Sequence, residues 1–383
     1  MSAHTGKPSI LHLVGSPTDD FTFHLNVFYA GSFDTEKQNG YNHWWAIIRP
    51  IDKKWAFLGA DQCASNGNWV SMVDLENQSL LDGVDMPWLE VGKAATFITG
   101  DIKPLFAIPH LFCFAGMTEY RSLLENLNIP FIGSGSMEAT VAQNKALTRA
   151  LLKEFEIAVP PGKILNKSDL NLEPTFIQHL EQAVGYPFVV KPTNTDNSTG
   201  ITLVQHSKEI IGALDTAFAF SNQIVIEKFI KGREIRCSVA EKTLQNGMKE
   251  LVTFHPQEYK ITKNEIRDLS DKLVVDRRGM PIGKAPSTKT NFLCREVEPE
   301  LFDNIQRLAL RVHTCLNFRD FSTIDVRVDE SGKPYVLEAN LFCSFGPKSL
   351  LNIHAERSGW TEEQLFAIMA KNVISRQGKQ PKE

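Results

Sequence analysis

Two alternating segments separated by a turn place the strongest constraint on how this chain folds. They lie in residues 324–340, IDVRVDESGKPYVLEAN. Ile324, Val326 and Val328 alternate with charged residues, a pattern typical of a strand with one apolar and one charged face. The turn at 330–332 then predicts that a second strand folds back on the first as a hairpin.

Three polar residues of this hairpin are candidates for a metal site. Glu338 and Asn340 are two residues apart in the second strand and therefore point to the same side. If the hairpin closes at its turn, Asp325 of the first strand lies beside them. Proteins bind Mg²⁺ through one or two carboxylates, together with waters and substrate phosphates. On these residues alone, a surface hairpin with solvated acidic side chains is an equally open alternative.

The composition is that of an ordinary globular protein. A chain of 383 residues is long enough for two or three domains, and its contents of 42% hydrophobic and 22% charged residues are usual ones. The net charge of −4 argues against a general nucleic-acid binder, which normally has a basic excess. No window approaches about 18 uninterrupted apolar residues, so we expect no membrane span.

The N-terminus and the cysteines indicate a compartment. The apolar run near the N-terminus is too short for a signal peptide. The six cysteines form no CxxC pair, which fits reduced thiols better than disulfides or a zinc site. We therefore expect a cytoplasmic α/β protein, with neither nucleic acid nor membrane as a partner.

Predicted strands and helices alternate in the first third of the chain. Residues 9–15 and 105–114 have the continuous apolar character of buried strands, and residues 129–135 predict a third strand that ends in a glycine turn. The apolar-rich stretch at 21–29 is a candidate helix, and helical spacing marks residues 118–128. This alternation predicts a parallel sheet, with ligands bound near the carboxyl ends of its strands.

The rest of the chain is less regular. Residues 31–100 show no clear pattern but contain five tryptophans, which we expect to pack in the core or at an interface. From residue 136 the spacing predicts one long helix over 136–156, and residues 186–192 predict a strand followed by a polar turn at 193–200. The charged segment 262–290 is long for a loop within a domain, so we expect it to be a lid.

Lysines and glutamates in separate segments form a series that suits a bound nucleotide. Lys145 lies in the long predicted helix, and Lys191 ends a strand just before a polar loop of the kind that forms a nest for phosphate oxygens. Glu227 and Glu234 bracket a glycine turn between two strands. Each of these residues alone is more simply a surface lysine or a salt bridge. Their order, followed by the hairpin ligands, is what a nucleoside triphosphate held between two sheets requires.

The same segments resemble the ATP-grasp superfamily, and within it the D-alanine–D-alanine ligases. The similarity runs from about residue 105 onward and is carried, in order, by GSGSMEATVAQNKALTRALLKEFEIAVPPG, YPFVVKP, IEKFIKGREI and IDVRVDESGKPYVLEAN. It implies an ATP-grasp fold of three α/β domains, at 1–135, 136–228 and 229–383, with ATP between the central and C-terminal domains. It also implies a pair of Mg²⁺ ions, with Mn²⁺ as a substitute, and a homodimer.

The resemblance assigns roles to individual residues. Those on the nucleotide side hold the phosphates, close over them, or face adenine and ribose, and they correspond to Lys145, Lys191, Ser198, Gly200, Glu227, Lys228 and Glu234. The implied metal ligands are Asp325, Glu338 and Asn340. Those on the substrate side contact the γ-phosphate or the first substrate, or supply a second cation, and they correspond to Glu119, Lys260, Arg267 and either Asp19 or Asp20.

Two departures distinguish this chain from those ligases. The ligases have an arginine two residues before the first metal aspartate, where this chain has Thr323. They also have a Pro-Gly pair, where this chain has Cys343-Ser344. Loss of a planar bidentate donor is not conservative. The departing loop LFCSFGPKS, together with LHLVGSPTDDF and VKPTNTDNSTG, resembles instead the D-Ala–D-Ala-ligase-like enzymes of mycosporine-like amino acid synthesis.

That second resemblance implies a different reaction. ATP would phosphorylate the ring keto (enol) oxygen of mycosporine-glycine, and the amine of an amino acid such as serine or threonine would displace phosphate and leave an imine. Ser344, Lys348 and Ser349 are the candidates for binding the carboxylate of this amino acid. The chain is thus expected to be an ADP-forming carbon–nitrogen ligase of the mycosporine type.

Two other functions are open alternatives. A D-alanine–D-alanine ligase, or another dipeptide ligase, would release ADP with D-alanine alone, which the mycosporine hypothesis does not expect. A catalytically silent module would bind ATP without turnover, although every implied phosphate and metal position holds a competent residue. The identity of the accepted amino acid rests on pocket contacts that the sequence does not specify.

Overall fold

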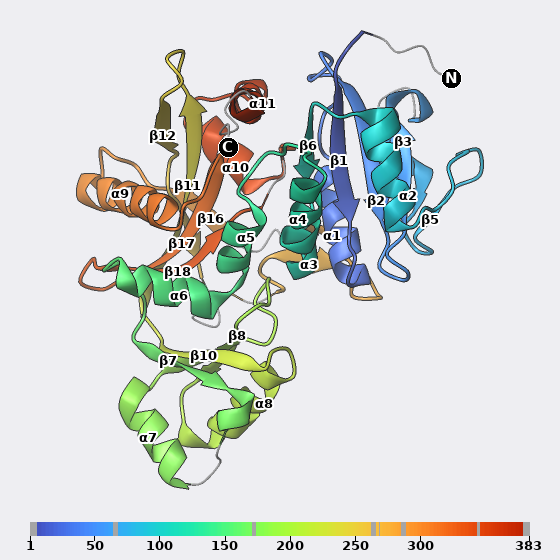
Figure 1. The fold of residues 1–383 in the computed structure, drawn as a ribbon. Helices are drawn as coiled ribbons and strands as arrows, with labels where there is room; N and C mark the ends of the chain where they lie inside the picture. The colour runs from blue at the N-terminus through green and yellow to red at the C-terminus, as the bar shows by residue number, and fades with distance from the viewer. Residues whose placement is uncertain are drawn as a thin grey trace, which may run out of the picture.

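The computed structural model describes residues 6–63, 68–170, 174–261, 266–267, 269–284, 289–342 and 345–377. These residues form three large sheets, each with its own helices (Figure 1). Two are four-stranded, with the strand orders β3-β2-β1-β6 and β7-β10-β8-β9. The third is six-stranded, with the order β16-β13-β11-β17-β18 and β12 paired to β11. Sheets of this kind with flanking helices confirm the expected α/β class.

The first sheet is built around a buried central strand. β1 (Ser9–Gly15) pairs in parallel with both β2 (Asn42–Ile48) and β6 (Phe106–Pro109), and β3 (Trp55–Gly59) is antiparallel at the edge. The strand expected at 9–15 is confirmed, and so is the helix expected near 21–29, which is α1 (Asp20–Ala30).

Two expectations for this region are wrong. Of residues 129–135, only Phe131 forms a bridge, to Ala107 of β6. Pro130 has no N–H to donate and Gly133 turns the chain at φ +101°, so no strand propagates there. Residues 31–100, expected to be irregular, contain β2 and β3 instead.

Shorter elements link the strands of the first sheet. Between β3 and β6 lie η1 (Ala60–Gln62), η2 (Trp69–Met72), β4 (Val73–Asp74), β5 (Ser79–Leu80), α2 (Val91–Phe97) and η3 (Ile98–Ile102). After β6 come α3 (Phe114–Met117) and α4 (Glu119–Asn126), which confirms the helix expected near 118–128. Trp45, Trp55 and Trp69 are buried, as expected for tryptophans that pack in the core.

The second sheet is antiparallel and lies at the lower end of the molecule in Figure 1. Its strands are β7 (Gly162–Asn166), β8 (Phe188–Pro192), β9 (Thr202–Val204) and β10 (Gln223–Lys228). Its helical elements are η4 (Lys167–Asp169), α7 (Pro174–Val184), η5 (Ser207–Glu209) and α8 (Ile210–Phe218). The strand expected at 186–192 is confirmed as β8.

The third sheet contains the hairpin that the alternating residues predict. Its strands are β11 (Gly232–Thr243), β12 (Lys249–Thr253), β13 (Gln257–Lys260), β16 (Lys289–Phe292), β17 (Phe321–Asp329) and β18 (Pro334–Asn340). Ile324, Val326 and Val328 are at most 2% exposed, because they pack in one core with residues of α9 (Pro299–Cys315). The chain ends with α10 (Leu350–Arg357) and α11 (Glu362–Gln377).

The single helix expected over 136–156 is two helices, α5 (Ser136–Gln143) and α6 (Lys145–Glu154). Asn144 interrupts them with an extended backbone, φ −117° and ψ 103°. Its side chain accepts hydrogen bonds from the N–H groups of Ala146 and Leu147, a typical N-cap. Lys145 is therefore the first residue of a helix rather than an interior one, and both helices contact β18.

The segment expected to be a lid is described in part. Residues 269–284 contain the hairpin of β14 (Leu273–Val275) and β15 (Pro281–Lys284), and β15 contacts α1 of the first sheet. Residues 262–265, 268 and 285–288 lie outside the described residues. This segment thus touches the first sheet's helix layer, and its closure over a ligand stays a prediction.

Three buried histidines form a hydrogen-bonded row across the first sheet. His12 Nε2 lies 2.9 Å from His43 Nδ1, and His12 Nδ1 lies 3.0 Å from His110 Nε2. His43 Nε2 lies 3.1 Å from the backbone carbonyl of Gln38, which can only accept. Burial lowers the pKa of His12 well below its usual value and also lowers the pKa of His43, so both rings are neutral at pH 7.

We expect the protein to lose stability as the pH falls below about 6.5. In this range the unfolded chain binds protons that His12 and His43 do not bind when folded, so the free energy of unfolding decreases by up to about 1.4 kcal/mol per pH unit for each of them. Urea unfolding at pH 7.5 and 5.5 measures this. His43→Gln is expected to weaken the pH dependence, and His179→Gln, an exposed control, to leave it unchanged. A midpoint independent of pH would contradict the expectation.

Candidate active site

The expected metal ligands lie together on one face of the third sheet. Asp325 is directly opposite Glu338 across the β17–β18 pair, and Asn340 follows on the same strand. The Nδ2 atom of Asn340 is 3.5 Å from Oδ2 of Asp325. Asp325 and Asn340 are buried, and Glu338 is partly exposed. The hairpin register therefore brings the three oxygen-bearing side chains to one place.

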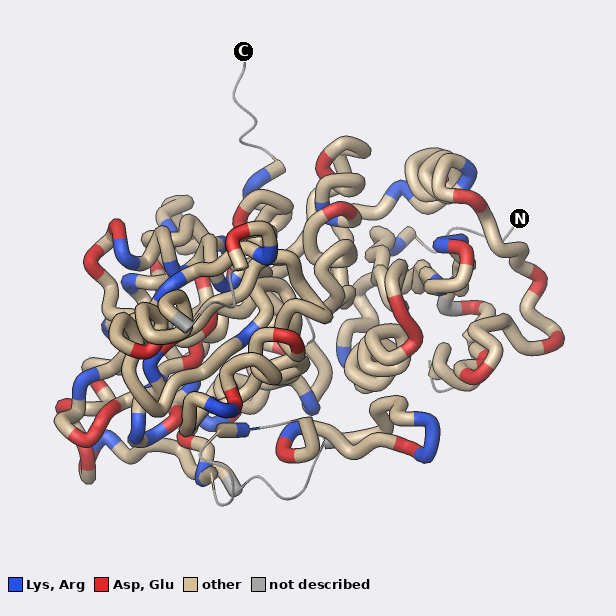
Figure 2. The backbone as a smooth tube through the Cα atoms, turned by 90° about the horizontal axis from the view of Figure 1, so that it is seen from below, with Lys and Arg blue, Asp and Glu red and all other residues tan. Residues whose placement is uncertain are grey.

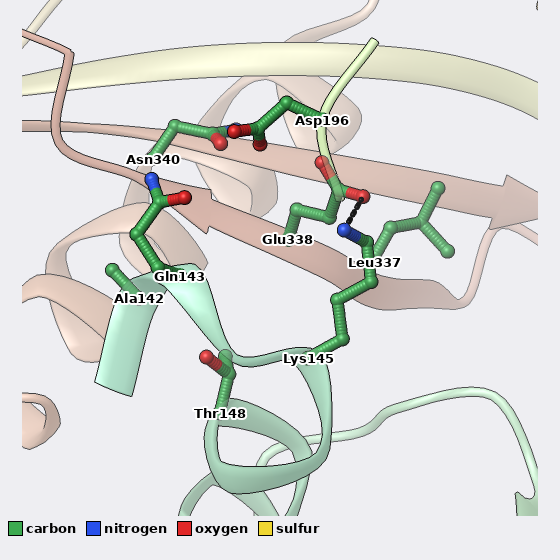
Figure 3. A pocket seen from close by; sticks show the side chains of 8 residues that line it. All are labelled: Ala142, Gln143, Lys145, Thr148, Asp196, Leu337, Glu338 and Asn340. Carbon is green, nitrogen blue, oxygen red and sulfur yellow. Dashed lines mark ion pairs between the residues drawn. The ribbon is translucent and has the colours of Figure 1, made fainter. Parts of the chain in front are cut away.

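A cavity opens next to Glu338. Its lining comes from α5, α6, β18 and the loop after β8, and consists of Ala142, Gln143, Lys145, Thr148, Asp196, Leu337, Glu338 and Asn340 (Figure 3). The Nζ atom of Lys145 is 3.4 Å from Oε1 of Glu338, and it also donates a hydrogen bond to the carbonyl of Thr195. A lysine, a carboxylate and an amide thus meet beneath the polar loop.

The second sheet supplies a buried charge cluster. The side chain of Lys191 in β8 donates a hydrogen bond of 2.5 Å to Oε1 of Glu227 in β10. Arg149, one turn after Lys145 in α6, lies 3.3 Å from the other oxygen of Glu227. All three side chains are buried. Lys228 is exposed and does not join this cluster; its backbone N–H donates to the carbonyl of Pro161.

The loop at 193–200 has the backbone shape of an anion-binding turn. Asn197 and Ser198 have positive φ angles of 55° and 65°, and Gly200 has 73°. A side chain at Gly200 would also lie 2.8 Å from Pro192 and Phe220. Residues with left-handed backbone turn successive N–H groups toward a common centre, which suits phosphate oxygens.

The start of α6 and the segment before β14 both hold this loop in place. The backbone N–H of Lys145 donates to the carbonyl of Thr193 at 2.7 Å. The hydroxyl of Ser198 donates to the carbonyl of Arg267 at 2.7 Å and accepts from the Nζ of Lys272 at 2.8 Å. The loop therefore bridges the segment before β14 and the start of α6.

Arg236 is a site residue that the sequence did not reveal. It lies directly opposite Asp325 across β11 and β17 and donates to both carboxylate oxygens. Only the register of these two strands, which are far apart in the sequence, identifies this pair. Thr323 therefore does not leave the site without a planar donor, because the neighbouring strand supplies one. The departure at Thr323 carries less weight for a changed acceptor than the sequence suggested.

Glu234 lies on the same face as Arg236 and pairs with two arginines. Its carboxylate oxygens are 3.3 Å from Arg267 and 3.3 Å from Arg327. The guanidinium of Arg267 stacks 3.7 Å from the ring centroid of Tyr259 in β13. Arg267 is thus held against the third sheet by Glu234 and Tyr259.

Several residues implied on the substrate side lie apart from this cluster. Lys260 and Glu119 are exposed, at the end of β13 and the start of α4. Ser349 is buried as the N-cap of α10, where it accepts from the N–H of Asn352. Lys348 is exposed over the ring of Phe28, 4.3 Å from its centroid. Ser344 lies outside the described residues.

The two aspartates implied at the first substrate have local structural partners. Asp19 caps α1, because its side chain accepts from the N–H of Thr22 at 2.7 Å. Asp20 accepts from the side-chain amide of Gln78. In this structure the contacts of both carboxylates are within the first sheet's own elements.

The carboxylates at the site have pKa values shifted in different directions. Burial raises the pKa of Asp325, against the lowering effect of Arg236. Burial acts in the same direction on Glu338, but Lys145 and Lys191 outweigh it and lower the pKa to about 2. Burial raises the pKa of Asp196 to about 6, although Lys145 opposes this. At pH 7 Glu338 is therefore firmly ionised, while Asp196 is mostly ionised but keeps a small protonated fraction.

The donor set suits Mg²⁺. Within the described part of the chain, no group of three His, Cys, Asp or Glu side chains converges as a metal site. Two carboxylates and an amide oxygen are nevertheless what Mg²⁺ takes from a protein when phosphates and waters complete its shell. Arg236 and Lys145 balance the charges of Asp325 and Glu338 in this structure. These two ion pairs fix the positions of both carboxylates in this structure.

Charge elsewhere on the molecule is mixed. Figure 2 shows basic and acidic positions interspersed over the chain rather than separated onto two faces. The positive charge at the site therefore comes from a few inward-facing side chains, Lys145, Lys191 and Arg236. Among the described helices, none combines the length and the apolar character needed to cross a bilayer.

Comparison with known families gives one match over most of the chain. The sequence model described as "D-ala D-ala ligase C-terminus" matches residues 151–371. A D-alanine–D-alanine ligase of Clostridium beijerinckii is 31% identical over 231 residues, which cover 60% of this chain and 68% of that one. The corresponding ligase of Buchnera aphidicola is 28% identical over 254 residues, covering 66% and 76%.

Solved structures are similar over nearly the whole chain. The VanG D-Ala:D-Ser ligase of Enterococcus faecalis superposes with a TM-score of 0.74 at 18% identity and covers 96% of this chain and 99% of its own. The D-alanine–D-alanine ligase of Coxiella burnetii gives 0.70 at 18%, covering 97% and 96%. That of Bacillus anthracis, solved with ATP, gives 0.63 at 19%, covering 96% and 98%. These likenesses confirm the expected ATP-grasp type of fold.

Proposed function

This chain belongs to the D-Ala–D-Ala ligase family, and we propose that it joins two amino acids in a reaction that consumes ATP. A member of this family is an enzyme, an ADP-forming ligase that makes a carbon–nitrogen bond with ATP and Mg²⁺. The observation that carries the proposal is the convergence of Lys145, Glu338 and Asn340 on one cavity beneath the polar loop.

ATP is proposed to lie between the second and third sheets. Lys145 and Lys191 are buried cations next to the loop at 193–200, and a triphosphate would replace the carboxylates that they now contact. Glu227 in β10 of the second sheet and Glu234 in β11 of the third sheet would accept hydrogen bonds from adenine and ribose. This placement assigns residues 1–135 to the substrates, and residues 136–228 and 229–383 to the nucleotide.

Asp325, Glu338 and Asn340 are proposed to hold Mg²⁺. When bound, the metal neutralises phosphate charge and polarises the transferring phosphoryl group. The chain's own contribution is to keep Glu338 ionised through Lys145 and Lys191, and to keep Asp325 oriented through Arg236. Prearranged charges of this kind favour the transition state because they need no reorganisation during the reaction.

The proposed reaction has two steps. The carboxylate of the first amino acid takes the γ-phosphoryl group, and ADP leaves. The amine of the second amino acid then attacks the carbonyl carbon, phosphate leaves, and the nitrogen loses a proton. Arg236 pairs with Asp325, and Arg267 pairs with Glu234 on the same face of the sheet, so both are proposed to steady the phosphorylated carboxyl group.

A second candidate is the ligation of an amino acid to mycosporine-glycine, and it rests on an aromatic cluster. The ring centroids of Tyr29 and Phe112 are 5.5 Å apart, and those of Phe112 and Phe342 are 5.2 Å apart. Tyr29 is close enough to Arg236 for that guanidinium to act on its pKa, which burial raises to about 12. Aromatic side chains suit a flat, conjugated acceptor ring, because offset and edge contacts add to the area they bury.

One assay separates the candidates. The protein is incubated with ATP and Mg²⁺ and, in parallel, with D-alanine alone, with D-alanine and D-serine, or with mycosporine-glycine and serine. The dipeptide proposal expects ADP in the first two mixtures. ADP only in the third, with an absorbance shift to longer wavelength, would establish the second candidate in its place. ATP binding without ADP in any mixture would contradict both and favour a silent binding module.

A further inference from the structure

A buried row of polar side chains leads from the candidate site into the third sheet. Thr323 lies directly opposite Asn340 in β18 and Ser238 in β11, so its side chain shares a face with Asp325. Its Oγ1 atom is 2.8 Å from Oγ of Ser238. That oxygen is in turn 2.8 Å from Nδ1 of His354 in α10, the helix beside β11 and β16 in Figure 1.

The far end of this row fixes the direction of its hydrogen bonds. Nε2 of His354 is 3.2 Å from Oε1 of Gln257, an atom that can only accept, while the amide nitrogen of Gln257 donates to Thr290 at 3.2 Å. A neutral His354 therefore carries its proton on Nε2 and accepts at Nδ1. Ser238 then donates to His354 and accepts from the hydroxyl of Thr323.

The near end of the row faces the site. Thr323 has 9% of its surface exposed to solvent, whereas Ser238 and His354 are fully buried. Because its only proton is directed at Ser238, the hydroxyl of Thr323 offers just its lone pairs to a substrate. Such an oxygen accepts from an N–H group, whereas an arginine at this position would donate to a carboxylate or phosphate.

We propose that Thr323, directed by Ser238 and His354, accepts a hydrogen bond from the amine of the incoming substrate and orients its lone pair toward the carbon it attacks. The inference rests on the proposed function, because it needs an amine nucleophile next to Asp325 and Asn340. His354 is a positioning residue, since it acts through Ser238. No proton leaves the row, so the step needs no further reactant.

Paired variants test the role of the hydroxyl. The KM for the amine is measured from ADP release, with D-serine varied at fixed D-alanine, or serine varied at fixed mycosporine-glycine, whichever pair the wild type turns over. Thr323→Val is expected to raise this KM about tenfold, the worth of one hydrogen bond, while Thr323→Ser stays near wild type. The KM for ATP is expected to stay unchanged in both. Equal values for the valine and serine variants would overturn the proposal.

The histidine has a matched control on the opposite face of the sheet. His313 is also buried and lies 2.8 Å from a serine, Ser322. His354→Leu is expected to raise the KM for the amine as Thr323→Val does, and His354→Asn, which retains an acceptor near Nδ1, to restore much of the effect. His313→Leu is expected to leave this KM unchanged. A rise in His313→Leu as large as in His354→Leu would mean a general structural effect and would overturn the proposal.

The direction of the row is measurable without turnover. Nitrogen NMR of selectively labelled histidines is expected to show His354 as the Nε2–H tautomer in the wild type. The Nδ1–H tautomer would overturn the proposal even if the kinetic results agreed with it. Absence of ADP release from the wild type with every amine would contradict the proposed function, and the tautomer alone would then decide whether Thr323 presents an acceptor.

Discussion

Replacing Glu338 by glutamine is expected to reduce the rate of ADP release by about a thousandfold. The change keeps the size of the side chain but removes the charge that Lys145 and Lys191 hold ionised. That carboxylate lines the cavity beneath the polar loop and lies 3.4 Å from Lys145. Losing it removes a proposed Mg²⁺ ligand and the carboxylate that pairs with Lys145, so both the metal and the phosphates would be held less well.

The matched control for this prediction is Glu330→Gln. Glu330 lies in the turn of the same hairpin, pairs with Lys231 at 3.1 Å, and is 69% exposed. Its replacement is expected to leave the rate within a factor of about two, because exposed ion pairs contribute little. A coupled assay of ADP release measures both variants, and urea unfolding checks that both fold. A Glu338→Gln enzyme with more than a third of the wild-type rate would contradict the proposed role.

Replacing Arg236 by methionine is expected to lower the free energy of unfolding by about 3–5 kcal/mol. Arg236 and Asp325 have side-chain exposures of 15% and 11%, and the guanidinium donates to both carboxylate oxygens. Removing the arginine leaves a carboxylate that burial already disfavours, since it raises the pKa of Asp325. The cost is that of an uncompensated buried charge rather than of the lost contact alone.

A double-mutant cycle separates these two contributions. Asp325→Asn in the Arg236→Met background removes the uncompensated charge and is expected to recover more than half of the lost stability. Arg233→Met is the control, because Arg233 likewise forms carboxylate ion pairs, with Glu258 and Glu298, but is 34% exposed, so its loss is expected to cost less. Urea unfolding gives all the values. Additive costs for Arg236→Met and Asp325→Asn would show that the pair is not coupled.

The hairpin was the most predictable part of the site, and the reason is local. Alternation in 324–328 and the turn at 330–332 depend on neighbours in the sequence, so they brought Asp325, Glu338 and Asn340 together as expected. The break at Asn144 was missed because the apolar spacing continues across it. The break is set by the Asn144 N-cap that starts α6, together with a hydrogen bond from the N–H of Lys145 to Thr193, a residue distant in the sequence.

Contacts between distant segments account for what the sequence did not reveal. Arg236 reaches Asp325 only because β11 and β17 pair in one register, and nothing in either segment signals that register. The same pairing sets Thr323 against Ser238. Asp196 lines the cavity because of the way its loop folds. The sequence identified the loop as polar but did not single out this residue. The strands β2 and β3 do contain short apolar runs, WWAII and WAFLG, but runs of this length are ambiguous between strand and helix, and the charged and polar residues around them hid them.

The most direct test of the whole account is the stoichiometry of the ATP reaction. The protein is given ATP and Mg²⁺ with and without its amine substrate, and the nucleotide products and the new carbon–nitrogen bond are quantified together. The account predicts one ADP and one phosphate for each bond formed, and no ADP above background without the amine. Formation of AMP, or ADP release that does not depend on the amine, would contradict it.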